Sequence, residues 1–314
     1  MKRKTFNTLK LLRPRQWIKN LAIFAAITFA GELFNPELFQ NAFVGFLVFC
    51  GLSSAIYIIN DIFDIEKDRL HPFKKFRPLA HRDLSIQYAL IIAALLGGIS
   101  LWVGLFINHG FFLLIIAYVV MQLFYSIFLK HIAVIDILAL AAGYILRVYA
   151  GEFATGLHIS VWLLLTTIAI SLFLAIGKRR SELTLISGYS DAQKASVRKS
   201  LSHYSERLLD VYASIFATST FISYSLFTFL ENPGGVKISL GLLMPEFLPT
   251  FFQRKWLMVT IIPVVYGIMR YLQDIYEKHE GESPEKVLLS DKPLLGTVVI
   301  WASLVIITIY LLGG

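Results

Sequence analysis

The sequence is poor in charged residues and almost free of cysteine. Only 16% of its 314 residues are charged, against about 25% in soluble domains, while 56% are hydrophobic and the mean hydropathy is +0.67. The shortage of charge excludes an ordinary soluble enzyme and indicates a polytopic membrane protein. The single cysteine, Cys50, lies in an apolar run, which excludes a disulfide framework and a metal site built on cysteines.

The sequence also lacks the short motifs of several large enzyme classes. It contains no GxxxxGK[ST], no GxSxG and no Rossmann fingerprint, so nucleophilic-serine and dinucleotide chemistry are unsupported. Its seven histidines are scattered without the spacing of metal ligands. Only His71, which stands beside Pro72 in a charged segment, is retained as a candidate site residue.

Long apolar runs dominate what is present. A bilayer crossing needs about 20 apolar residues, and nine runs satisfy that rule, which predicts an all-α bundle forming a single domain over residues 1–314. The runs cover residues 17–34, 41–60, 87–107, 111–129, 132–154, 160–177, 208–230, 256–273 and 294–312.

Lysine and arginine alternate sharply between the two sides of this predicted bundle. The basic stretches 1–16, 61–86 and 178–207 carry six, six and seven, whereas the short turns 35–40, 108–110 and 155–159 carry none. The positive-inside rule predicts a multi-pass protein of the cell membrane with its N-terminus in the cytoplasm. The polar loops predicted on that side are 61–86, 178–207 and 274–293. Because the net charge of +8 is concentrated in such loops, we interpret it as a topology signal and not as nucleic-acid binding.

Three aspartates follow the second apolar run, in the sequence NDIFDIEKD. At about 100° per residue, Asp61, Asp64 and Asp68 fall within about 60° of one another on a helix, so they share one face. Carboxylates gathered in this way repel each other unless a cation lies among them, and hard oxygen ligands suit Mg²⁺ carrying a diphosphate. We therefore predict that all three are metal ligands. The alternative is a solvated, salt-bridged loop at the membrane surface.

Cations surround this motif and recur after the sixth apolar run. Lys74 and Arg77 follow the aspartates, and such side chains suit the oxygens of phosphates. Three consecutive cations and an acidic residue end the sixth run, namely Lys178, Arg179, Arg180 and Glu182. These cations are either topology anchors or an anion clamp that faces the aspartates across the bundle. A third polar segment, residues 270–292, carries acidic residues that we interpret mainly as solvated.

Ionisable residues inside the predicted helices are rare and therefore informative. Asp136 and Arg147 lie in the fifth run, eleven residues apart, which is close to three full turns and puts them on one face. The alternative is a pair between Arg147 and Glu152. Tyr125 and Lys130 stand at the cytoplasmic end of the fourth run, where the lysine either snorkels or binds phosphate.

Together these features resemble the UbiA superfamily of intramembrane prenyltransferases, and more narrowly its decaprenyl-phosphate phosphoribosyltransferase branch. The resemblance covers almost the whole chain. It rests on the aspartate motif, the nine predicted helices and the segments RPRQWIKN from Arg13, DRLHPFKKFRP from Asp68, YSIFLKHIAVIDI from Tyr125, YILRVYAG from Tyr144, GKRRSEL from Gly177 and GESPEKVLLSDKPL from Gly281. Such proteins are all-helical bundles that hold a polyprenyl substrate and Mg²⁺-diphosphate in a cavity open to the cytoplasm and the lipid.

One departure from the superfamily bears on the substrate. Members that prenylate aromatic acceptors usually carry a second aspartate-rich motif after the sixth helix, whereas this chain has KRRSEL there. A second aspartate set binds a second Mg²⁺ on a prenyl diphosphate, but cations suit phosphates that are bound directly. The resemblance therefore implies Mg²⁺-dependent transfer of phosphoribose from phosphoribosyl diphosphate to a polyprenyl phosphate, as a precursor for cell-wall arabinose.

The resemblance also implies roles for particular residues. Asp61 and Asp64 would hold the Mg²⁺-diphosphate, while Asn60 would orient a carboxylate, a metal-bound water or a ribose hydroxyl. The residues expected to contact the substrates are Lys19, Asp68, His71, Lys74, Arg77, Tyr125, Lys130, Arg147, Lys178, Arg179, Arg180 and Glu182. No side-chain nucleophile is required, because the acceptor phosphate is already anionic near neutral pH.

Two other functions stay open at this point. A prenyltransferase that moves a polyprenyl chain onto an aromatic acceptor would depend on prenyl diphosphate and not use phosphoribosyl diphosphate. A transporter is the alternative from another class, but transporters place ions near the bilayer midplane at broken helices, whereas these charges gather at one surface. The lipid chain length, the number of Mg²⁺ ions and any homo-oligomer are left open.

Overall fold

The computed structural model describes residues 2–70, 74–185, 199–231, 256–277 and 284–311. Every regular element in these ranges is helical, as the sequence predicts, and no strand occurs among them. Eight helices of the described residues are long and apolar enough to cross a bilayer, so the chain is a multi-pass membrane protein. They are α3 (Pro36–Phe63), α5 (Ile86–Ile107), α6 (His109–Ile127), α7 (Ile135–Thr155), α8 (Val161–Leu185), α10 (Glu206–Leu230), η6 with α12 (Trp256–Thr260 and Ile261–Glu277) and α14 with η7 (Lys292–Ile306 and Ile307–Leu311).

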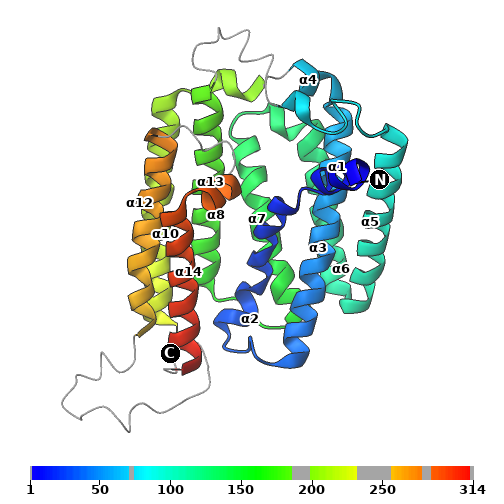
Figure 1. Cartoon of the computed structure of the whole chain (residues 1–314). Coiled ribbons are helices and arrows are strands. Elements are labelled where there is room, and N and C mark those ends of the chain that lie inside the picture. The colour runs from blue at the N-terminus through cyan, green and yellow to red at the C-terminus, as the bar shows by residue number, and fades with distance from the viewer. Residues whose placement is uncertain (1, 71–73, 186–198, 232–255, 278–283, 312–314) are drawn as a thin grey trace, which may run out of the picture.

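The helices form a bundle with an apolar outer surface. In Figure 1, α3, α5 and α6 stand on one side, α8, α10, α12 and α14 on the other, and α7 between them, in contact with α3, α6 and α8. Trp102, Phe106 and Leu113 point outward and are 62%, 72% and 67% exposed. Large apolar side chains so exposed on two neighbouring helices indicate a surface that faces hydrocarbon and not water.

The first predicted span is not a regular α-helix. It consists of the 3-10 helix η1 (Pro14–Phe24) and the short α-helix α2 (Ala25–Phe29). Because a 3-10 helix rises about 2.0 Å per residue, the two together extend about 30 Å, the thickness of the hydrocarbon core. Figure 1 shows this segment running from the end of the bundle where α1 (Lys2–Leu12) lies to the end where α3 begins. A ninth crossing, and with it the orientation of the N-terminus, stays a prediction.

The segments predicted as polar loops are largely helical where they are described. α3 continues through Asp61 to Phe63, and α8 continues through Glu182 to Leu185, because the backbone hydrogen bonding of a helix does not stop where its side chains become polar. Short helices fill much of the rest: α4 (Ile65–Leu70), η2 (Lys74–Phe76), η3 (Leu129–His131), η4 (Lys199–His203) and α13 (Pro284–Ser290). The candidate site residues are therefore carried mostly on helix ends and short helices.

Candidate active site

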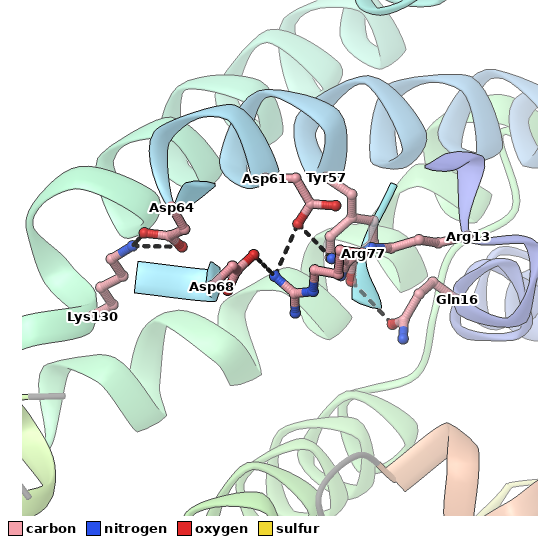
Figure 2. A network of polar contacts seen from close by, with 8 residues as sticks. All are labelled: Arg13, Gln16, Tyr57, Asp61, Asp64, Asp68, Arg77 and Lys130. Atoms are coloured by element: carbon pink, nitrogen blue, oxygen red, sulfur yellow. Dashed lines mark hydrogen bonds and ion pairs between the residues drawn. The ribbon is translucent and has the colours of Figure 1, made fainter. Parts of the chain in front are cut away.

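The three aspartates lie at the C-terminal end of α3 and on α4. Asp61 is in the last turn of α3, Asp64 caps it, and Asp68 follows on α4; Asp61 and Asp68 are buried. Figure 2 shows that these carboxylates contact two different groups of cations. Asp61 and Asp68 meet at Arg77, whereas Asp64 turns to Lys130. The structure thus brings two of the three predicted metal ligands to one point and leaves the third beside it.

Arginine side chains neutralise the paired carboxylates. Arg77 Nη1 lies 3.0 Å from Asp61 Oδ1 and 2.6 Å from Asp68 Oδ2, and Arg13 Nη2 lies 2.5 Å from Asp61 Oδ1. Burial raises the pKa of Asp68 and the Asp61 charge adds to this, while the charges of Arg77 and Lys74 oppose it. Two buried carboxylates that share one guanidinium nitrogen have a strong requirement for a cation between them.

The same donor set fits a divalent cation. No three histidine, cysteine, aspartate or glutamate side chains in the described part of the chain are grouped closely enough to hold a metal ion. However, Arg77 Nη1 already lies between Asp61 and Asp68, and hard carboxylate oxygens such as theirs suit Mg²⁺, so these two residues would hold the ion. The Arg77 side chain is one-quarter exposed, so it can move aside.

Arg13 and Lys130 fix the outer edges of this cluster. Lys130, on η3, is buried, and its Nζ lies 3.1 Å from Asp64 Oδ1. Arg13 stands between α1 and η1 with a left-handed backbone, φ 54°, which is uncommon for a residue with a side chain. Pro14 disfavours the right-handed helical region for the residue before it, so α1 ends here and the chain turns. This turn brings the Arg13 guanidinium to Asp61.

A second polar layer lies deeper in the bundle and connects to the first. The Arg13 guanidinium stacks over the Tyr57 ring, 5.0 Å from its centroid, and the Tyr57 hydroxyl donates to Gln16 Oε1 at 3.1 Å (Figure 2). Gln16 in turn donates to Glu285 on α13. Lys19 Nζ donates to Gln16 Oε1 at 2.7 Å and pairs with Glu285 Oε2 at 2.9 Å. Polar contacts therefore continue from the aspartates to α13.

The three consecutive cations of α8 point in different directions. Arg179 is fully buried, with Nε 2.7 Å from Asp136 Oδ2 and Nη1 2.5 Å from Glu182 Oε2. Its Nη2 donates to the Tyr125 hydroxyl at 2.9 Å. Arg180 pairs at the surface with Asp210 and Glu206, at 2.7 and 3.1 Å. Lys178, unlike its two neighbours, lines a cavity of the bundle.

Arg147 is buried in α7 and reaches the same cavity. Its Nε donates to Asn20 Oδ1 at 2.7 Å, its Nη2 donates to the Tyr118 hydroxyl at 2.8 Å, and its Nη1 donates to the Gly143 carbonyl. The alternative pair with Glu152 does not form, because Glu152 contacts His158 at 2.8 Å. Asp136 is used by Arg179, so Arg147 pairs with no carboxylate among the described residues.

Two adjacent cavities lie inside the bundle. The larger, about 450 Å³, is apolar and is lined by side chains of η1, α2, α7, α8, α10, α12, α13 and α14. Its volume is typical of a small-molecule site, and its lining suits a hydrocarbon chain. The smaller, about 40 Å³, contains Lys19, Arg147 and Lys178 in its wall. Lys19, Tyr144, Leu174 and Pro284 line both cavities, so the cationic pocket adjoins the apolar one on the side where Lys19 and Glu285 lie.

The predicted site residues therefore fall into three groups. Those around the aspartates are Asp61, Asp64, Asp68, Lys74, Arg77 and Lys130, with Asn60 half-buried one residue before Asp61. Those in the cationic pocket are Lys19, Arg147 and Lys178. The half-buried Tyr125 and Glu182 contact the buried Arg179 and join α6 to α8, and Arg180 lies at the surface. His71 lies outside the described residues.

Sequence reasoning did not identify Arg13, Gln16, Tyr57 and Glu285 as part of this network. The interpretation of the third polar segment as mainly solvated is wrong for Asp274, Glu285 and Asp291, which are 1%, 4% and 7% exposed. A usable signal was present in RPRQWIKN, where several charged and amide side chains interrupt the start of an apolar run.

Comparison with known proteins shows which family the sequence matches. The UbiA prenyltransferase family matches residues 21–290. The decaprenyl-phosphate phosphoribosyltransferase of Corynebacterium glutamicum is 33% identical over 97% of this chain and 87% of its own length. The protein of the same name from Mycolicibacterium smegmatis is 34% identical over 96% of this chain and 92% of its own length.

The fold is shared with solved structures. A UbiA homologue from Archaeoglobus fulgidus, bound to GPP and Mg²⁺, has a TM-score of 0.69 over 95% of this chain and 98% of that chain, at 19% identity. The family match covers most of the chain. The chain belongs to the UbiA prenyltransferase family.

Proposed function

We propose that this chain transfers 5-phosphoribose from phosphoribosyl diphosphate to a polyprenyl phosphate and releases diphosphate. Relatives named decaprenyl-phosphate phosphoribosyltransferase, similar over nearly their whole length, support this assignment. The observation that carries it is the pairing of a carboxylate cluster fit for a metal-bound diphosphate with a cationic pocket that adjoins an apolar cavity. Such a site has a place for a diphosphate and another for a lipid phosphate.

The first place is the aspartate cluster. Asp61 and Asp68, with Asp64 beside them, would hold Mg²⁺, which when bound neutralises charge on the diphosphate leaving group. Arg77 and Arg13, released from the carboxylates, would then contact phosphate oxygens, for which the planar guanidinium is well suited. Lys130 holds the Asp64 carboxylate in place beside the other two aspartates.

The second place is the cationic pocket. An acceptor phosphate held there by Lys19 and Lys178 would have its hydrocarbon chain in the apolar cavity. One of its oxygens forms a bond to C1 of the ribose while the bond from C1 to the diphosphate oxygen breaks, and the diphosphate leaves with the electron pair. No base is needed because the attacking oxygen is already anionic. Catalysis then comes from positioning and from charge stabilisation.

The donor is expected to enter from the cytoplasm. The aspartates, Lys130, the last turn of α8 and α1 all lie at one end of the bundle, which is also the lysine- and arginine-rich end (Figure 1). By the positive-inside rule this end faces the cytoplasm. A cytoplasmic site suits a soluble, highly charged donor.

Replacing Asp61 tests the assignment. Membranes containing the protein are incubated with radiolabelled phosphoribosyl diphosphate, a polyprenyl phosphate and Mg²⁺, and labelled lipid is measured. We expect Asp61→Asn to lower the rate at least about 100-fold, because one of two paired oxygen ligands is lost. EDTA should abolish the product in the unaltered protein.

Glu66→Gln is the matched control for this test. Glu66 is an exposed carboxylate on α4, between the aspartates in sequence, and it should keep the full rate. Full transfer by Asp61→Asn would contradict the site. Transfer of label from prenyl diphosphate to an aromatic acceptor, with none from phosphoribosyl diphosphate, would favour the alternative prenyltransferase, and no labelled product at all would favour a transporter.

A further inference from the structure

The small cationic pocket carries more positive charge than its neighbours balance. Among the described residues, its wall contains Lys19, Arg147 and Lys178 and no carboxylate. Arg147 is satisfied only by neutral partners among the described residues, so its charge is not cancelled. The carboxylate next to this set is Glu285, which lies in the wall of the apolar cavity, 2.9 Å from Lys19 Nζ.

Glu285 is firmly placed and ionised. Gln16 and Lys19 both contact its carboxylate, and the Glu285 side chain is 3% exposed. Burial alone would raise the pKa of Glu285, but the charges of Lys19 and Lys178 outweigh it and lower this pKa to about 2. Lys19 uses two of its three N–H groups on Gln16 and Glu285, which leaves one for a ligand in the pocket.

The resulting charge is that of a site for a phosphate monoester. Three cations and one carboxylate leave two positive charges, and a monoester carries close to two negative charges, about −1.5 to −2, near neutral pH. A lipid diphosphate carries about one negative charge more, which would face Glu285 without compensation. The pocket volume of about 40 Å³ has room for about three waters, which is comparable to one phosphate group.

We infer that Glu285 is the residue that makes this pocket select a lipid monophosphate over a lipid diphosphate. The inference rests on the proposed function, which assigns an acceptor phosphate to this pocket. Glu285 determines specificity in two ways. Its ion pair holds Lys19 in position, and its charge repels the second phosphate of a lipid diphosphate. Because the pocket shares Lys19, Tyr144 and Pro284 with the apolar cavity, the phosphate it selects is one attached to a hydrocarbon chain.

A binding experiment tests this without relying on turnover. The full-length protein in detergent, with EDTA present so that no metal holds a diphosphate at the aspartates, is titrated with radiolabelled farnesyl phosphate and farnesyl diphosphate. We expect the unaltered protein to prefer the monophosphate. Glu285→Gln, which keeps the shape and an acceptor for Lys19, should reduce that preference about tenfold, mainly through tighter binding of the diphosphate.

Three further variants make the result specific. Glu285→Asp keeps the charge and should keep most of the preference, and Glu277→Gln, at the exposed end of α12, should change nothing. Lys178→Gln should weaken the binding of farnesyl phosphate. This variant tests the pocket even if Glu285→Gln fails to fold. An equal preference in the unaltered protein and in Glu285→Gln would overturn the inference.

Competition separates the possible sources of the phosphate. Ribose 5-phosphate and inorganic phosphate should displace farnesyl phosphate only weakly, since they lack the chain that fills the apolar cavity. Strong displacement by ribose 5-phosphate would assign the pocket to the sugar donor and overturn the inference. A protein that makes labelled lipid from phosphoribosyl diphosphate but has an unchanged preference in Glu285→Gln contradicts this inference alone. A protein that makes none contradicts the proposed function.

Discussion

Arg179 is a charged residue whose role is set by burial. It is fully buried, and Asp136, Glu182 and Tyr125 surround its guanidinium. Asp136 is equally buried and also accepts hydrogen bonds from Ser200 and Tyr204, which joins α7, α8 and η4. A buried charge of this kind is costly to leave unpaired.

Removing one of the carboxylates that pair with Arg179 should therefore destabilise the end of the bundle that carries the aspartates. We expect Asp136→Asn to lower the free energy of unfolding by about 3 kcal/mol, because the buried Arg179 loses its fully buried carboxylate partner and keeps only the less buried Glu182. Chemical unfolding of the detergent-solubilised protein measures this loss. Arg180→Gln is the matched control and should cost less than about 1 kcal/mol, because Arg180 and its partner carboxylates are partly exposed. Equal losses in the two variants would contradict a structural role for Arg179.

At the scale of elements, η1 is held unusually close to α7. A β-carbon at Gly151 would lie 1.9 Å from the Ile23 carbonyl oxygen, so the backbones of the two elements touch where no side chain fits. The same element carries Gln16 and Lys19 toward Glu285 and follows Arg13 directly. The position of η1 thus determines the geometry of both polar layers.

Widening this contact should disturb stability and activity together. Gly151→Ala must displace η1, because the clash is with backbone and not with a flexible side chain. We expect a loss of about 2–4 kcal/mol in the free energy of unfolding and a lower rate of lipid labelling. Gly296→Ala on α14, where a β-carbon has open space, should be neutral or slightly stabilising. A Gly151→Ala protein with normal stability would show that this close contact is not formed.

At the scale of the whole molecule, the predictable features are the local ones. Runs of about 20 apolar residues are enough to predict the eight described spans, since membrane crossing depends on length and hydropathy alone. The aspartate motif is likewise contained in nine consecutive residues. The partners that complete the site are not local: Arg13 and Asp61 are 48 residues apart, and Gln16 and Glu285 are 269 apart.

Such pairings depend on which helices pack together, and nothing in the local pattern specifies that. For the same reason, the sequence did not separate the buried Arg179 from the surface Arg180 or from Lys178 in the cavity wall. The 3-10 form of η1 was also unpredictable, because it accompanies a contact with Gly151, more than a hundred residues later in the chain.

The number of crossings can be decided by labelling single cysteines. Cys50 is buried and should be unreactive, and it can be replaced by serine for this purpose. Thr5 and Lys75 are exposed at the aspartate end of the bundle, and His158 is exposed between α7 and α8 at the opposite end. Each is changed to cysteine in turn, and intact cells are treated with a maleimide that cannot cross the membrane.

If η1 and α2 cross the bilayer and the basic end faces the cytoplasm, only His158→Cys is labelled before the cells are broken, and Thr5→Cys and Lys75→Cys react afterwards. The alternative of eight crossings puts residue 5 on the other side of the membrane from residue 75. In that case the maleimide would label Thr5→Cys in intact cells, as it labels His158→Cys. Labelling of Lys75→Cys in intact cells would show that the basic end faces outward, and it would contradict entry of the donor from the cytoplasm. The contact of Lys10 Nζ with the Phe76 carbonyl oxygen at 2.9 Å favours the first outcome, because it holds α1 on the same side as η2.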